Sequence, residues 1–116
     1  MRVIIAGSRA IDDYSAVARA VESCGVHPDV VLSGCCRGVD RCGERWAMEH
    51  KIAIERHPAD WARYGRAAGI IRNAEMVKRA DVLIAVLSNA HECRGTNAIV
   101  KLAIREGLQV YVRELP

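Results

Sequence analysis

Phenylalanine is absent from this sequence, and other aromatic residues are scarce, with two tryptophans and three tyrosines. Hydrophobic residues nonetheless make up 51% of the 116 positions. A core must therefore be built from valine, isoleucine, leucine and alanine, and a chain of this length can bury a sizeable one. No apolar run approaches the roughly 20 residues that cross a bilayer, so we expect no contact with the membrane interior.

Motifs for metal and common cofactor chemistry are missing as well. No two cysteines show CxxC spacing, which disfavours a zinc or redox site at Cys24, Cys35, Cys36, Cys42 or Cys93. The sequence has neither the GxGxxG fingerprint nor the GxxxxGK[ST] phosphate loop. We therefore expect no metal, no resident cofactor and free thiols that fill small apolar spaces. Because the N-terminal run MRVIIAG is too short for a secretion signal, we expect a cytoplasmic protein.

The charge is mildly basic, with a formal net charge of +3 from 17 basic and 14 acidic residues. This excess is too small to indicate duplex DNA binding, but it favours an anionic ligand. The 14 acidic residues are interspersed with the 17 basic ones along the chain, which argues against a basic track for single-stranded DNA.

Short β-rich runs alternate with amphipathic helical patterns along the chain. Strands are expected at residues 2–6, 30–32, 52–55, 81–87 and 108–112, and helices near 14–21, 39–50, 67–77 and 96–105. Nearly continuous apolar strands are typical of a parallel sheet covered on both faces. Right-handed crossovers then predict one α/β domain over residues 1–116, a Rossmann-like three-layer sandwich whose five-stranded parallel sheet has the order 3-2-1-4-5.

The helical patterns also predict which side chains pack inward. Trp46 lies on the apolar stripe of its helix and is expected in the core. In the helix near 67–77, the predicted inward face holds Ala67, Ile70, Ile71, Ala74 and Val77. Thr96 is expected to be the N-cap of the last helix.

The unusual residues follow the strands, and in a parallel sheet all such loops emerge at one edge, where ligands bind. The segment SGCCRGVD at residues 33–40 could be a redox or metal site, a plain turn, or an anion cradle. Glycines permit close backbone approach at helix N-termini, where free N–H groups suit a phosphate, and Arg37 adds a charged fork. The joint clustering favours the cradle, with candidate ligand-binding residues Gly7, Ser8, Arg9, Ser33, Gly34, Arg37, Gly38, Asp40, Gly95 and Thr96.

These residues also resemble a known family. The segments GSR at 7–9, SGCCRGVD at 33–40, PADWARYGRAAG at 58–69, Arg72-Asn73 and Gly95-Thr96 resemble the YspA-like branch of the SLOG superfamily. That superfamily comprises small Rossmann-like domains that sense or process nucleotides and their derivatives, many of them from bacteria and phages. The resemblance implies a nucleotide ligand, with Asp40, Asp60, Trp61, Tyr64, Arg72 and Asn73 shaping its ribose and base side.

More distant kin are the LOG phosphoribohydrolases and the DNA-processing protein DprA. Arg72 and Gly95-Thr96 match positions of the LOG pattern, but Ala98 and Ile99 stand where an acidic residue is expected. Cleavage of a ribosidic bond is normally assisted by a carboxylate. If the protein is an enzyme, Asp60 and Arg72 are the candidate catalytic residues. Asp60 could equally serve only as the N-cap of a helix. His91 and Cys93 lack a third orienting residue, which disfavours a nucleophile and base pair.

We therefore predict that the protein binds or senses a nucleotide or nucleotide derivative through a phosphate cradle. One alternative is a nucleoside-phosphate N-glycosidase that uses Asp60. Another is a DprA-like binder of single-stranded DNA, which the weak charge disfavours. Trp61 and Tyr64 could stack on a base or instead wall off the core. The sequence is compatible with a homo-oligomer as well as with a monomer.

Overall fold

The computed structural model describes all 116 residues, and its helices and strands alternate as the sequence predicts. The strands are β1 (Arg2–Gly7), β2 (Val30–Ser33), β3 (Ala53–Arg56), β4 (Val82–Ser88) and β5 (Gln109–Leu115). The helices are α1 (Tyr14–Glu22), α2 (Val39–Glu49), α3 (Trp61–Tyr64), α4 (Ala68–Arg79) and α5 (Arg94–Arg105), with a 3-10 turn η1 (Gly65–Ala67) between α3 and α4.

The five strands form one sheet in the order β3-β2-β1-β4-β5, and every neighbouring pair is parallel. The predicted order and direction are therefore confirmed. The register pairs Gly7 at the end of β1 with Val86 of β4. The loops that follow β1 and β4 consequently leave the sheet side by side, at the point where the strand order reverses.

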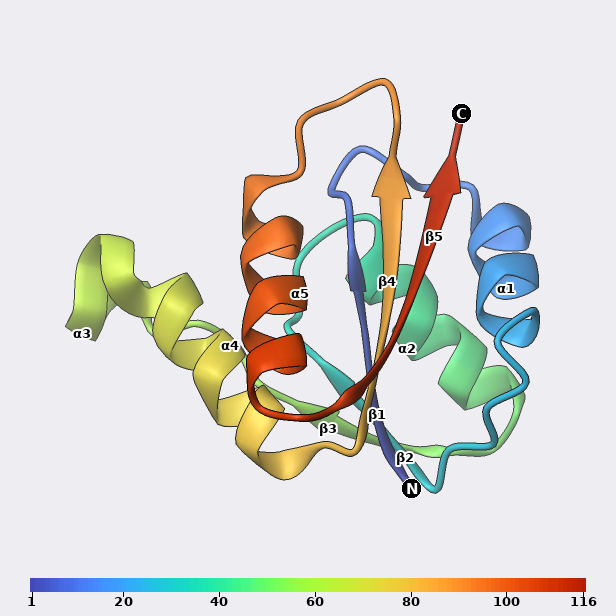
Figure 1. The fold of residues 1–116 in the computed structure, drawn as a ribbon, viewed down its shortest axis with the longest axis horizontal. Coiled ribbons are helices and arrows are strands. Elements are labelled where there is room, and N and C mark those ends of the chain that lie inside the picture. Colours follow the sequence, from blue (N-terminus) through green and yellow to red (C-terminus); the bar gives the residue numbers. More distant parts are fainter.

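Two helix pairs cover the sheet, one on each face (Figure 1). On the face of α1 and α2, a core cluster contains Val17 and Trp46, together with Ile5 and Ile84 of the central strands. On the face of α4 and α5, a smaller cluster contains Met76 and Ile99, again against β1 and β4. Trp46 is 5% exposed, which confirms its predicted place in the core.

The inward face of α4 differs from the predicted one. Of the five residues expected there, only Val77 is buried, and Ile70 is 70% exposed. The buried positions are instead Ala68, Arg72, Met76 and Val77. The physical reason is that Arg72 is drawn inward by a hydrogen bond from its Nη1 to the Gly34 carbonyl, 2.6 Å away, which rotates the apolar stripe outward.

The segment before α4 stands away from the sheet. Figure 1 shows α3 projecting from the body of the fold at the start of α4. Every residue from 61 to 67 is exposed, in α3 and in the 3-10 turn η1 that follows it. None of the helices is both long enough and apolar enough to span a bilayer.

Candidate functional site

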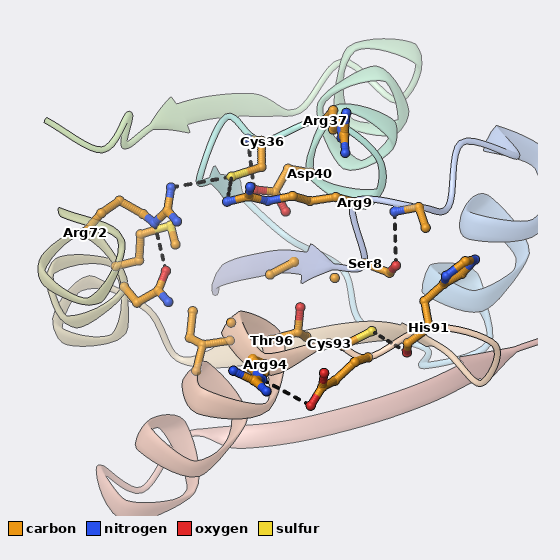
Figure 2. Close-up of a pocket in the computed structure, with 18 residues that line it drawn as sticks. Ser8, Arg9, Cys36, Arg37, Asp40, Arg72, His91, Cys93, Arg94 and Thr96 are labelled. Atoms are coloured by element: carbon orange, nitrogen blue, oxygen red, sulfur yellow. Dashed lines mark hydrogen bonds and ion pairs between the residues drawn. The ribbon is translucent and has the colours of Figure 1, made fainter. Parts of the chain in front are cut away.

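A cavity of about 400 Å³ opens at the carboxyl ends of β1 and β4, where the strand order reverses (Figure 2). Its walls come from the loop after β1, the start of α2, one side of α4 and the loop that leads into α5. The lining residues with polar or charged groups are Ser8, Arg9, Cys36, Arg37, Asp40, Arg72, Asn73, His91, Glu92, Cys93, Arg94 and Thr96. Parallel α/β sheets bind ligands at this position.

Close packing of two glycines fixes the loop after β1. A Cβ on Gly7 would lie 2.0 Å from the Val86 carbonyl oxygen, and a Cβ on Gly38 would lie 2.4 Å from the Ser8 carbonyl oxygen. Gly38 also has a φ of 78°, which side chains rarely tolerate. The loop is therefore held between β4 and the start of α2, and the Val39 N–H donates to the Ser8 carbonyl at 3.1 Å.

The N-termini of α2 and α5 both face the cavity, and neither has a capping side chain. In α5 the first helical hydrogen bond runs from the Asn97 N–H to the Cys93 carbonyl at 2.8 Å. The N–H groups of Arg94, Gly95 and Thr96 thus have no acceptor within the protein. Thr96 is not the N-cap, because α5 begins at Arg94 and its N-cap is Cys93. Free N–H groups and the helix dipole favour an anion at such a place.

Arg72 brings a buried positive charge to the cavity wall. The residue is 8% exposed and forms no ion pair. Its Nη1 donates to the Gly34 carbonyl and its Nε donates to the Asn73 side-chain oxygen at 2.8 Å, while its Nη2 has no protein acceptor. Gly34 makes room for this arrangement, since its Cβ would lie 2.9 Å from the Nη1 of Arg72. The Asp40 carboxylate is close enough to interact with the Arg72 charge but makes no direct ion pair with it, so the Nη2 of Arg72 stays available to an anion.

Asp40 is the buried carboxylate of the cavity, with 5% exposure. Its Oδ2 accepts a hydrogen bond from the Cys36 N–H at 3.2 Å. Burial raises the pKa of Asp40 to about 6, and the Cys36 N–H and the Arg72 guanidinium limit that rise. At neutral pH the carboxylate is therefore mostly ionised, and it can accept a hydrogen bond from a ligand hydroxyl.

Arg9 and Arg37 also line the cavity, and Arg9 lies beside Cys36. The Cys36 sulfur lies 3.8 Å from the Nη2 of Arg9 and 3.9 Å from the Nη1 of Arg72. Arg37 is exposed at the rim. Arginines outnumber carboxylates among the lining residues, and only Arg94 is paired, with Glu92 at 3.1 Å. The cavity is therefore electropositive.

The structure brings together nine of the predicted ligand-binding residues: Gly7, Ser8, Arg9, Arg37, Asp40, Arg72, Asn73, Gly95 and Thr96. Ser33, Gly34 and Gly38 do not line the cavity but support its walls. The Ser33 hydroxyl donates to the buried Glu44 at 2.6 Å and accepts from the Cys35 N–H at 3.1 Å, which shapes the turn before α2.

Three predicted residues lie outside the cavity. Asp60 is exposed and caps α3, because its Oδ1 accepts from the Arg63 N–H at 3.1 Å. Trp61 and Tyr64 are 53% and 38% exposed, so neither walls off the core. In contrast, Cys36, His91, Glu92 and Cys93 line the cavity without having been assigned to it. A sequence signal existed for them, because both of their loops lead directly into helix N-termini.

The fold and the cavity define a class, a Rossmann-like α/β protein with an electropositive pocket at the switch point of its sheet. Residues 1–64 match the family described as YspA, cpYpsA-related SLOG family. The chain is also 38% identical over 94 residues to the Gene 61 protein of Mycobacterium phage D29. The aligned region covers 72% of this chain and 74% of the phage protein. No solved structure matches the chain. The chain belongs to the YspA, cpYpsA-related SLOG family, as its sequence motifs predict.

Proposed function

We propose that the protein binds or senses a nucleotide or nucleotide derivative, whose phosphate lies in the cavity between the N-termini of α2 and α5. The observation that carries this proposal is the buried Arg72, which has no ion pair and keeps its Nη2 without a protein acceptor. This nitrogen is not fully buried, because every buried side-chain nitrogen or oxygen has a partner, so Nη2 is free to donate to an anionic ligand. Membership in the SLOG family supports the nucleotide class of the ligand.

Each part of the cavity has a role in this proposal. The free N–H groups of Gly95 and Thr96 donate to phosphate oxygens, and Arg9 and Arg37 add charged donors from the opposite side. Asp40 accepts from a ribose hydroxyl. Glycine at position 95 leaves the approach open, because no atom lies within 4 Å of where its Cβ would be.

Binding is a better account of the cavity than hydrolysis. Ile99 lines the wall and is 2% exposed, so an apolar side chain occupies the region where a LOG-type carboxylate is expected. Asp60, proposed as its substitute, caps α3 outside the cavity. The carboxylates that remain are Asp40 and Glu92, and the latter is paired with Arg94. Binding of single-stranded DNA is a weaker alternative, because the net charge is only +3.

Calorimetric titration with nucleoside monophosphates of the four common bases, and with the matching nucleosides, tests the proposal. We expect the monophosphates to bind and the nucleosides to bind far more weakly. Arg9→Ala and Arg72→Gln should each weaken monophosphate binding about tenfold or more, since a charged hydrogen bond contributes roughly 1.5–3 kcal/mol. Arg72→Gln keeps a donor for the Gly34 carbonyl, and Arg9 is exposed, so both variants are expected to fold.

Arg105→Ala is the matched control, because it removes an equal charge from the far end of α5, where Arg105 lies beside Glu106. If affinity does not depend on the phosphate, or if Arg105→Ala weakens binding as much as Arg9→Ala does, the proposed site is wrong.

A further inference from the structure

A second cavity of about 460 Å³ adjoins the first and shares part of its wall. Ala10, in the loop after β1, and His91, in the loop after β4, line both cavities. From this junction the second cavity extends toward the start of α1 and the end of β5, where Ala16 and Leu115 line it. The two cavities therefore follow one another along the carboxyl edge of the sheet.

Two buried serines hold the loops on either side of the junction. The Ala10 N–H donates to the Ser8 hydroxyl at 3.1 Å, and the Ala90 N–H donates to the Ser88 hydroxyl at 3.2 Å. Each serine lies at the end of its strand, so each loop turns at once into the position that lines the junction. The protein itself fixes both sides of the junction.

The chemistry of the second cavity differs from that of the first. The carboxylates of Asp12 and Asp13 line it together with a single guanidinium, that of Arg19, and no ion pair of the structure includes any of the three. Ile11 and Leu115 add apolar surface. Two carboxylates repel a second phosphate, but they accept hydrogen bonds from hydroxyl groups, and the apolar surface suits C–H groups. This lining matches an uncharged group that is rich in hydroxyls.

We propose that the second cavity binds a sugar that is esterified to the phosphate of the ligand, and we call it the sugar subsite. The proposal rests on the proposed function, because it requires a phosphate in the first cavity. Figure 2 shows Arg72 and His91 at opposite sides of that cavity, with Arg9 and Thr96 between them. A phosphate at the start of α5 thus has the Arg72 side for the nucleoside and the junction at His91 for the sugar. The ligand class is a nucleoside diphosphate sugar.

The experiment compares two ligands that carry the same base, namely the base of the tightest-binding nucleoside monophosphate. One ligand is the nucleoside diphosphate and the other is its glucose ester, and each is titrated by calorimetry. The glucose ester should bind the wild type about tenfold or more tightly, the effect of one or two hydrogen bonds to a charged group. Because the ester carries less negative charge than the free diphosphate, the electropositive first cavity works against this gain, and the gain must come from the sugar.

Two variants test whether the gain arises in the sugar subsite. Ala16→Leu fills the subsite from α1, whereas the control Ser15→Leu adds the same side chain at an exposed position that lines neither cavity. Asp12→Ala removes one hydroxyl acceptor; Asp12 is exposed, and the N-cap of α1 is Asp13. Ala16→Leu and Asp12→Ala should each remove most of the difference between the two ligands without weakening the diphosphate, and Ser15→Leu should retain it. A melting curve of each variant checks that it is folded.

The outcomes separate this inference from the function on which it rests. If the glucose ester binds no more tightly than the diphosphate, or if folded Ala16→Leu and Asp12→Ala proteins keep the difference, the sugar subsite is wrong and the phosphate cavity stands. If these variants weaken both ligands equally, they act on the first cavity and the inference again fails. If neither ligand binds the wild type, the phosphate cavity and the sugar subsite are both wrong.

Discussion

Replacing Asp40 by asparagine should abolish a loss of stability that the wild type undergoes as the pH rises toward neutral, although it also removes a polar group of the binding cavity. Burial raises the pKa of Asp40 from 3.8 to about 6 in the folded protein. The folded state therefore holds this proton more tightly than the unfolded chain does. The resulting stability is fully present below pH 3.8 and is lost as the pH rises through about 6, because the buried carboxyl must then ionise.

The size of the effect follows from the shift. Each pKa unit corresponds to about 1.4 kcal/mol, so raising the pH from 4 to 7.5 should cost the wild type about 2 kcal/mol through Asp40. The asparagine side chain of the Asp40→Asn variant cannot ionise, and its oxygen can still accept from the Cys36 N–H. Between pH 4 and pH 7.5, the free energy of unfolding of the variant should therefore rise by about 2 kcal/mol relative to that of the wild type.

Urea unfolding at several pH values, followed by the fluorescence of the buried Trp46, measures the difference. Other carboxylates titrate in both proteins and cancel from the comparison. Any fixed cost of the amide, which places a donor where Asp40 has an acceptor, shifts the variant equally at every pH. A difference between the two proteins that stays constant from pH 4 to 7.5 would show that Asp40 is not held with a raised pKa.

Three further predictions concern particular residues. Gly38→Ala should destabilise the fold by more than about 2 kcal/mol in urea unfolding, because Gly38 has a left-handed backbone and its Cβ would lie 2.4 Å from the Ser8 carbonyl oxygen. The control Gly95→Ala should change stability by less than about 0.5 kcal/mol, and equal effects of the two substitutions would contradict the packing argument. Arg37→Ala should weaken nucleotide binding about tenfold in calorimetry without moving the melting temperature, and unchanged affinity would place Arg37 outside the site. No free base should form when the protein is incubated with nucleoside monophosphates, and rapid release abolished by Asp60→Asn would restore the hydrolase reading.

Much of the fold could be predicted because its signals are local and repeated. Each apolar run of β-branched residues is bounded by turn residues, and this alternation predicts a parallel sheet with right-handed crossovers. The order 3-2-1-4-5 in turn places the loops after β1 and β4 together, which is why Arg9 and Thr96 could be assigned to one site from sequence. That much of the site depends only on the topology of the sheet.

The rest depends on how side chains rotate and pack, which local patterns do not encode. The apolar stripe through Ile70 and Ile71 predicted the wrong face of α4, because Arg72 lies on the inward face, where it donates to the Gly34 carbonyl, and Ile70 is exposed. Asp60 was assigned to the site by resemblance, but the structure turns it onto the cap of an outlying helix. The position of Cys36 before a helix N-terminus is visible in the sequence, but its contacts with Arg9 and Arg72 depend on the tertiary position of its loop.

The most direct test of the proposed phosphate site is a crystal structure of the protein with the tightest-binding nucleoside monophosphate. We expect the phosphate in the cavity at the carboxyl ends of β1 and β4, where it accepts hydrogen bonds from the N–H groups at the start of α5 and from the side chain of Arg9 or Arg72. A phosphate that lies in solvent, or a nucleotide bound at another surface while the cavity contains only water, would contradict the proposal.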